Sequence, residues 1–183
     1  MICRYILLII ILINFPGLTY AQSKEEITER IREEIESIHL DTALKSVTLQ
    51  NEEFLENMTD GGGELTGFYK GKNISRIYRS IGISYGVGIS EFYYKKNRLI
   101  FIREKFNSYV YNDSLGTADY TKLNTTYSAK HYFDNGKLIE SNSTGHKITS
   151  VDDPDIEQIL LDESVEAFNL IQNKILSLTG HEK

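Results

Sequence analysis

The chain has 183 residues, a formal net charge of −6 and a single cysteine, Cys3. Hydrophobic residues make up 40% of the sequence and charged residues 25%, which is typical of a globular protein and excludes a disordered chain. The basic residues are dispersed and are outnumbered by acidic ones. Because binding to a phosphate backbone needs clustered lysine and arginine, we expect no nucleic-acid partner.

The N-terminus has the layout of a cleavable secretory signal. A short, positively charged start precedes an almost unbroken apolar stretch at 5–15, which is too short to span a bilayer. Small residues then occupy the −3 and −1 positions of a cleavage site between Ala21 and Gln22. We therefore predict a signal peptide over residues 1–21 and no transmembrane segment in the mature chain.

Cleavage at this site would remove Cys3 and leave residues 22–183 without cysteine. Such a mature chain excludes disulfides, thiolate metal sites and cysteine nucleophiles. Eukaryotic secreted domains of this size often carry disulfides, so a cysteine-free chain favours export in a bacterium. The expected location is the periplasm of a Gram-negative cell or the extracellular space. The length predicts a single domain over 22–183.

The mature chain is expected to begin with a helix at about 23–39. Ser23 can cap its first turn, and Glu26 follows three residues later, as in a capping box. Four isoleucines recur at helical spacing and form one narrow apolar stripe: Ile27, Ile31, Ile35 and Ile38. We favour packing of this stripe on the protein's own sheet over binding to a partner helix.

The middle of the chain contains three copies of a strand–turn–strand unit. Each copy has an aromatic pair, a polar turn and then an aliphatic segment. The copies are FYKGKNIS at 68–75, YYKKNRLI at 93–100 and YFDNGKLI at 132–139. The third turn contains Asn135 and Gly136, the strongest short-range signal for a two-residue hairpin.

These hairpins predict a curved antiparallel β-meander of six or seven strands at about 61–149. The polar segment 112–126 is expected to be a loop within it. Both faces of the sheet would be apolar around 99–102, so we expect its middle to be covered on both sides or strongly curved. A long apolar stripe predicts a second helix at about 154–178, with Asp153 as its N-cap. The expected fold class is α+β, a hairpin-repeat meander flanked by two helices.

The repeated units resemble the strand–turn–strand repeats of MORN-variant proteins. The glycine-rich run at 59–69, together with 81–86, is similar to sequences in a group of uncharacterised exported Bacteroidota proteins. The resemblance extends over roughly 59–139, with fewer copies and less regular spacing than tandem MORN arrays. It implies a hairpin-repeat sheet, and it implies no activity and transfers no catalytic residue.

Motifs for catalysis or cofactor binding do not occur in the sequence. There is no G-x-S-x-G nucleophile elbow, and the four histidines share no metal-binding spacing, so we expect no cofactor and no metal. His131, on a predicted strand, is the only histidine expected to be held rigidly, and we interpret it as a surface or packed residue rather than a functional one. A carboxylate-dependent hydrolase acting on envelope or imported polysaccharide stays an alternative, because it needs only two facing carboxylates. Its candidates are strand glutamates: Glu64, Glu91, Glu104 and Glu140.

The favoured function is non-catalytic binding of an unknown protein or glycan. Neighbouring strand residues point to opposite faces, so each aromatic pair would place one ring in the core and one on the outer face. Cross-strand packing explains such rings. The alternative is a row of exposed tyrosines, which offer large contact area at low entropic cost. The residues predicted for that surface are Tyr69, Tyr85, Tyr93 and Tyr132, with the 82–88 connection as a second element. The sequence leaves the oligomeric state undetermined.

Overall fold

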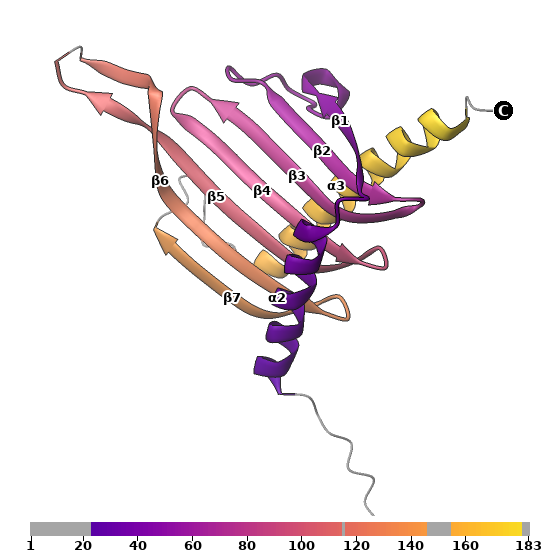
Figure 1. Cartoon of the computed structure of the whole chain (residues 1–183). Helices are drawn as coiled ribbons and strands as arrows, with labels where there is room; N and C mark the ends of the chain where they lie inside the picture. Colours follow the sequence, from indigo (N-terminus) through magenta and orange to yellow (C-terminus); the bar gives the residue numbers. More distant parts are fainter. Residues whose placement is uncertain (1–22, 115, 146–154, 181–183) are drawn as a thin grey trace, which may run out of the picture.

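The fold is a seven-stranded antiparallel sheet with one helix on each face (Figure 1). The structure, a computed structural model, describes residues 23–114, 116–145 and 155–180. Helix α2, Lys24–Leu40, precedes the sheet, and helix α3, Ile156–Gly180, follows it. The strands are β1 Lys45–Gln50, β2 Gly63–Lys70, β3 Asn73–Ile83, β4 Gly86–Lys95, β5 Arg98–Asn112, β6 Thr117–Asp134 and β7 Lys137–Gly145. They lie in sequence order in one open sheet, which confirms the expected α+β meander with its two flanking helices.

Two parts of the sheet differ from the sequence expectation. The sheet begins with β1 rather than near residue 61, because β1 pairs along its whole length with β2. Segment 112–126 is mostly strand rather than loop in its described part, since β6 starts at Thr117 and pairs with the end of β5. The threonines and tyrosines of this segment favour extended backbone. The resulting two-stranded projection at 107–126, termed the arm, extends beyond the other strands (Figure 1).

The three repeated units form three hairpins with the same irregularity. In each hairpin the register shifts by one residue beside the aromatic pair: Phe68/Tyr69, Tyr93/Tyr94 and Tyr132/Phe133. The return strand therefore contains one unpaired bulge residue in each case: Ser75, Ile100 and Ile139. In the third turn, Asn135 and Gly136 have φ values of 50° and 78°, as a type I′ hairpin turn requires. The sequence repeat is thus a repeat of bulged hairpins.

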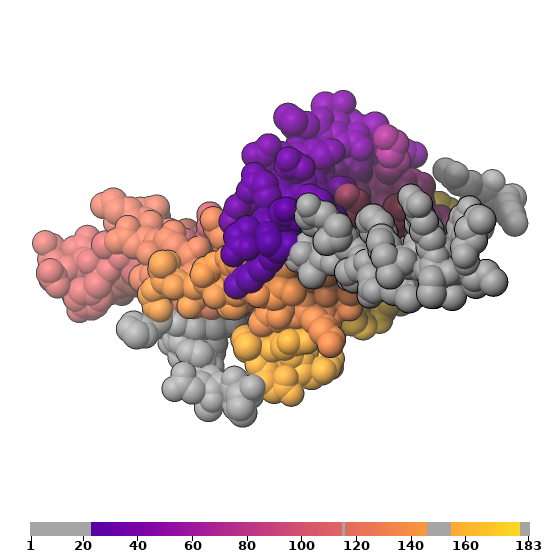
Figure 2. All heavy atoms as spheres, turned by 90° about the horizontal axis from the view of Figure 1, so that it is seen from below, coloured from indigo at the N-terminus to yellow at the C-terminus, as the bar shows by residue number. Residues whose placement is uncertain are grey.

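The two helices lie on opposite faces of the sheet, as Figure 2 shows with α2 in indigo and α3 in yellow. At the start of α2 the backbone N–H of Glu26 donates to Ser23 Oγ at 3.2 Å, which confirms the expected cap. Helix α3 extends to Gly180, and its expected cap, Asp153, lies outside the described residues.

Coverage by both helices explains the apolar segment at 99–102. Leu99 and Ile102 pack toward α3, whereas Ile100 and Phe101 pack toward α2. The expectation that the middle of the sheet is covered on both sides is therefore confirmed.

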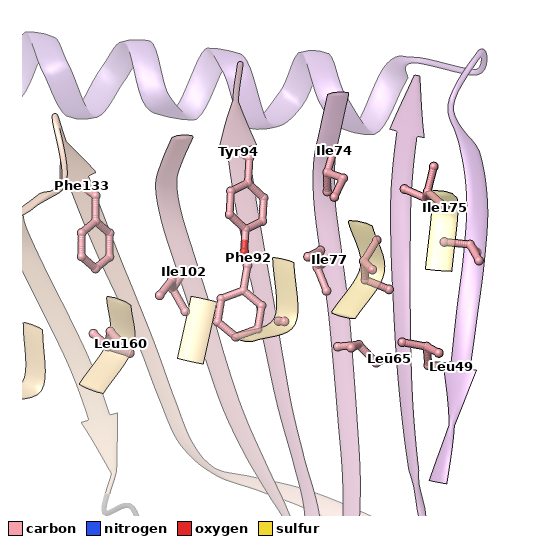
Figure 3. Packing of buried hydrophobic residues seen from close by; sticks show 13 residues of the cluster. Leu49, Leu65, Ile74, Ile77, Phe92, Tyr94, Ile102, Phe133, Leu160 and Ile175 are labelled. Atoms are coloured by element: carbon pink, nitrogen blue, oxygen red, sulfur yellow. The ribbon is translucent and has the colours of Figure 1, made fainter. Parts of the chain in front are cut away.

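Helix α3 packs on the sheet through the larger of two cores, the α3-side core (Figure 3). Gly67 lets the helix approach closely, because a Cβ atom at this position would lie only 2.2 Å from Ile171 Cγ2. The hydroxyl of Tyr94 donates to the carbonyl oxygen of Ser164 at 2.8 Å and so fixes the helix to β4. The buried members of this core are Val47, Leu49, Leu65, Ile74, Ile77, Phe92, Tyr94, Ile102, Phe133, Leu160, Ala167, Ile171 and Ile175.

Helix α2 packs through a smaller and more aromatic set of residues, the α2-side core. The Phe101 ring lies between two tyrosines, with centroid distances of 5.6 Å to Tyr93 and 4.9 Å to Tyr132. His39, near the end of α2, places its Nε2 atom 3.0 Å from the Tyr93 hydroxyl. Burial lowers the pKa of His39, and the nearby charge of Arg76 adds to the shift. The buried members are Ile31, Ile35, Ile38, Tyr93, Phe101 and Tyr132.

Candidate functional site

Two of the four predicted surface tyrosines are buried. Tyr93 and Tyr132 belong to the α2-side core, and their strand neighbours Tyr94 and Phe133 belong to the α3-side core. No outer face exists at these positions, because a helix covers each side of the sheet. Tyr69 is partly buried and packs against the α3-side core. The expectation of an exposed row of strand tyrosines is therefore wrong.

Tyr85 is exposed, and it borders a cavity. This residue lies in the turn between β3 and β4 and keeps 44% of its surface accessible. The cavity has a volume of about 270 Å³ and is lined by residues of β3, β4, β5, β6 and α3. We term it the α3-side cavity. The 82–88 connection, a candidate binding element from the sequence, forms part of its wall.

The walls of the α3-side cavity are mainly apolar. The rings of Tyr85 and Phe106 are in contact, with their centroids 5.7 Å apart, and both line the cavity together with Ile81 and Ile83. Gly88 contributes no side chain. A Cβ atom at Gly88 would lie 3.9 Å from its nearest neighbours, so this glycine leaves space that a larger residue would fill.

An ion pair between the sheet and the helix supplies polar groups to the same cavity. The guanidinium of Arg79 on β3 is bonded to the carboxylate of Glu163 on α3, and it also donates to Ser90 Oγ at 3.3 Å. The Arg79 guanidinium lies 5.3 Å from the centroid of the Phe92 ring, which supports it from the core side. Because the two charges of the pair cancel, they present hydrogen-bonding groups with little net charge.

Glu104 and Tyr127 line the cavity from β5 and β6. Burial raises the pKa of Tyr127 to about 12, and the charge of Glu104 adds to the shift. The Tyr127 hydroxyl therefore keeps its proton at neutral pH. Glu104 pairs in register with Ala129, whose small side chain leaves room for the glutamate to lean toward the next residue on that face of β6, His131.

Three neighbouring strands bring Glu104, His131 and Ser141 into one line. His131 Nε2 lies 3.0 Å from Glu104 Oε2, and His131 Nδ1 lies 2.9 Å from Ser141 Oγ. The side chains of His131 and Glu104 are 3% and 7% exposed, whereas Ser141 is exposed on β7. Of the two alternatives for His131, surface or packed, the structure shows the packed one, and its two partners come from strands on either side.

The contact between His131 and Ser141 was missed in the sequence for a physical reason. Counting back from the Asn135-Gly136 turn without a bulge places His131 opposite Glu140. The bulge residue Ile139 shifts the register by one, so His131 pairs with Ser141 instead. In the sequence, only the aliphatic pair at the end of the repeated unit indicated a bulge, and it did so indirectly.

The other candidate glutamates lie on the opposite face of the sheet. Glu91 is bonded to Arg76 at 2.5 Å and to Arg103 at 3.0 Å, so its carboxylate is shared by two guanidiniums. Glu64 accepts hydrogen bonds from Gln50 and Thr66, and Glu140 is paired with Lys24 at 3.3 Å. Of the four predicted carboxylates, only Glu104 lines the α3-side cavity, where Glu163 is a second one that the sequence did not single out.

Within the described residues, no three histidine, cysteine or acidic side chains are grouped as a metal site requires. None of the helices in the described ranges is long and apolar enough to cross a membrane. Comparison of the chain with protein-family models, with curated proteins and with solved structures gives no match. The functional argument therefore depends on the geometry of the site.

Proposed function

We propose that this protein is an exported binding protein that holds one sugar unit of a glycan in the α3-side cavity. One observation carries the proposal. The cavity places two aromatic rings, Tyr85 and Phe106, beside a strand–helix ion pair, Arg79 and Glu163. This combination of flat apolar surface and fixed donors and acceptors matches a molecule with both C–H faces and hydroxyl groups.

Each part of a sugar has a counterpart in the cavity. The C–H face of a pyranose can pack on an aromatic ring, and its hydroxyls both donate and accept hydrogen bonds. Arg79 supplies donors, Glu163 supplies acceptors, and the Ser90 hydroxyl can do either. Because the Arg79–Glu163 pair is neutral as a unit, it favours an uncharged polar ligand over a free anion or cation.

The size of the cavity limits what it can hold. Its volume of about 270 Å³ lies just below the roughly 300–1,000 Å³ typical of ligand sites. A single ring at the end or side of a glycan fits this volume better than an extended oligosaccharide. A side chain of a protein partner is the other occupant of similar size, and the experiment below distinguishes the two.

Export is part of the proposal and has its own support in the sequence. The apolar stretch at 5–15 and the small residues before Gln22 are typical of a cleaved signal. Intact-mass analysis of the protein from the periplasmic or culture fraction is expected to give a chain that starts at Gln22. A mature mass that retains Met1 to Ala21 would contradict this part of the proposal.

Binding can be tested with methyl glycosides of glucose, galactose, mannose and N-acetylglucosamine in saturation-transfer NMR. We expect at least one of them to bind the wild-type protein. Gly88→Val should abolish that binding, because its methyl groups would occupy the cavity without backbone strain. Tyr85→Ala should weaken it by about fivefold, since an aromatic contact contributes about 1 kcal/mol.

The matched control is Tyr111→Ala. Tyr111 is an exposed tyrosine on the arm, outside the cavity, with 62% of its surface accessible. This variant should bind as the wild type does. Equal binding by wild type and Gly88→Val, or loss of binding in Tyr111→Ala alone, would contradict the cavity as the sugar site. If no glycoside binds, and a protein partner binds the wild type but not Gly88→Val, the occupant of the cavity is a side chain of that partner rather than a sugar.

The hydrolase alternative can be tested in the same samples. Glu104 and Glu163 both line the cavity, as two carboxylates of a glycosidase would. Aryl glycosides of the sugar that binds would release their aryl group if the site were hydrolytic, and Glu163→Gln would stop the release. Binding without release supports a binding protein.

A further inference from the structure

A second feature of the structure extends from Glu104, at the edge of the proposed sugar site, to Ser141 and His131, which do not line it. Ser141, His131 and Glu104 form a hydrogen-bonded line across β7, β6 and β5, with distances of 2.9 and 3.0 Å. Ser141 does not line the α3-side cavity and is exposed on the last strand of the sheet. The line therefore runs from the surface of β7 to a buried carboxylate.

The protonation of this line follows from the chemistry of its ends. With an ionised Glu104, which can only accept hydrogen bonds, and a neutral imidazole, the proton lies on His131 Nε2. In that tautomer His131 Nδ1 has a lone pair, and the Ser141 hydroxyl donates to it. This is the arrangement of a serine nucleophile, a general base and an orienting carboxylate, with the two ring nitrogens exchanged relative to the usual order.

The imidazole of His131 is shielded from solvent. His131 has 3% of its side chain exposed, so bulk water does not compete for its ring nitrogens. The β6–β7 register and the Ile139 bulge fix Ser141 opposite the imidazole on a regular strand rather than on a mobile loop. We propose that Ser141 is an activated serine nucleophile that cleaves carboxylic esters reaching the face of β7. This activity goes beyond the proposed sugar binding and does not depend on it.

The step balances without a further reactant. Ser141 Oγ attacks the ester carbonyl carbon while its proton passes to His131 Nδ1, and the Glu104 carboxylate balances the charge of the imidazolium. Collapse of the tetrahedral intermediate breaks the bond to the alcohol, which leaves with the proton from His131. Water then attacks the acyl-serine by the same route, so the products are the carboxylic acid and regenerated Ser141.

A fluorophosphonate probe tests the nucleophile on the native full-length exported protein. Attack by Ser141 Oγ would form a P–O bond and release fluoride, and peptide mapping by mass spectrometry would locate the adduct. We expect labelling at Ser141 and none at Ser143, which is exposed on the same face of the same strand. Protein unfolded in urea should not be labelled. Absence of an adduct in the native protein, or equal labelling of the two serines, would overturn the proposal.

Variants of the exposed serines give the catalytic readout with little risk to folding. Ser141→Ala should lose hydrolysis of p-nitrophenyl acetate, whereas Ser143→Ala should retain it. Acetyl-Ser141 should also be detectable in wild-type protein quenched with acid. Equal hydrolysis by wild type and Ser141→Ala would overturn the proposal, since surface groups would then account for the reaction.

Variants of the buried pair test the roles assigned to them. His131→Gln, if its circular dichroism is that of the wild type, should lower the labelling rate by about 100-fold or more, the contribution of a general base. Glu104 acts as a positioning residue through His131. Glu104→Gln should lower the maximal labelling rate by at least about tenfold and leave the half-saturating probe concentration unchanged. An unchanged maximal rate in a folded His131→Gln variant would overturn the proposal.

Discussion

The two faces of the sheet are built differently. On the α3 face the core is mainly aliphatic, and two of its polar contacts join the sheet to the helix, from Arg79 to Glu163 and from Tyr94 to the carbonyl of Ser164. These contacts cross between layers, and the α3-side cavity lies beside one of them.

On the α2 face the core has a larger share of aromatic rings, and it has a charge network within the sheet in addition to contacts between the helix and the sheet. Glu91 on β4 pairs with Arg76 on β3 and Arg103 on β5, so charged side chains from three adjacent strands neutralise one another. The guanidinium of Arg76 also lies 5.0 Å from the centroid of the Phe68 ring. None of these groups lines the α3-side cavity.

The difference assigns separate roles to the two faces. The α3 face buries more apolar surface, so it should contribute more to stability, and it also contains the cavity with polar groups at its edge. On the α2 face, the charged groups around Glu91 pair with one another within the sheet. The predictions below test this division, from the largest expected effect on stability to the smallest.

The α3-side core should be the more sensitive to loss of volume. Ile171 is fully buried above Gly67, and Ile171→Ala should lower the free energy of unfolding by about 4 kcal/mol, because truncation loses burial and leaves a cavity. Ile35→Ala on α2 should lower it by about 2 kcal/mol, since Ile35 lies in the smaller core and is 8% exposed. Urea denaturation measures both. A larger effect at Ile35 would reverse the ranking of the two faces.

The charge network of the α2 face should depend on its shared carboxylate. In Glu91→Gln two guanidiniums lose their counter-charge, and their partial exposure to water reduces the usual cost of a broken buried pair to about 2 kcal/mol. Glu64→Gln is the matched control, because Glu64 lies on the same face and is bonded to neutral groups. Its effect should be within about 0.5 kcal/mol. Equal losses from the two variants would show that the guanidiniums do not need Glu91.

Alkaline titration should affect both faces through their tyrosines. Burial raises the pKa of Tyr93 on the α2 side and of Tyr127 on the α3 side to about 12 each, from 10 for an unperturbed side chain. Unfolded chains would lose these protons first, so their contribution to stability is complete below pH 10 and declines as the pH rises through 12. Melting temperatures between pH 9 and pH 12 measure the decline.

Phenylalanine variants distinguish the contributions of the two tyrosines to the alkaline loss of stability. Tyr93→Phe and Tyr127→Phe should each flatten part of the alkaline loss, because the variant has no hydroxyl to ionise. A saturating glycoside should delay the loss in wild type and change it less in Tyr127→Phe. If the melting temperature declined equally at alkaline pH in wild type and both variants, residues other than Tyr93 and Tyr127 would cause the decline.

The sequence was informative where local patterns determine structure. The isoleucine spacing predicted α2, and the aromatic–turn–aliphatic units predicted hairpins whose common bulge the structure then revealed. The 112–126 segment was misread because its polar composition resembles a loop, whereas pairing between β5 and β6 holds it extended. Local propensity could not show that pairing.

Less of the candidate site than of the fold could be predicted from the sequence. Tyr85 and the 82–88 connection were identified, but Tyr93 and Tyr132 were placed on a surface that the helices cover. Glu163 was not predicted as a site residue, and its partner Arg79 lies 84 residues earlier in the chain. Pairs so distant in sequence depend on how α3 lies across the sheet, which periodicity alone does not give.

The most direct test of the central claim is a ¹H–¹⁵N correlation titration of the mature protein with the methyl glycoside that binds best. We predict saturable shifts of the amides at 82–88 and of Phe106, with residues 108–123 of the arm unchanged. The same titration of Gly88→Val should show no shifts at these positions. Shifts confined to the arm or to the α2 face, with no shifts of the amides at 82–88, would contradict a sugar site in the α3-side cavity.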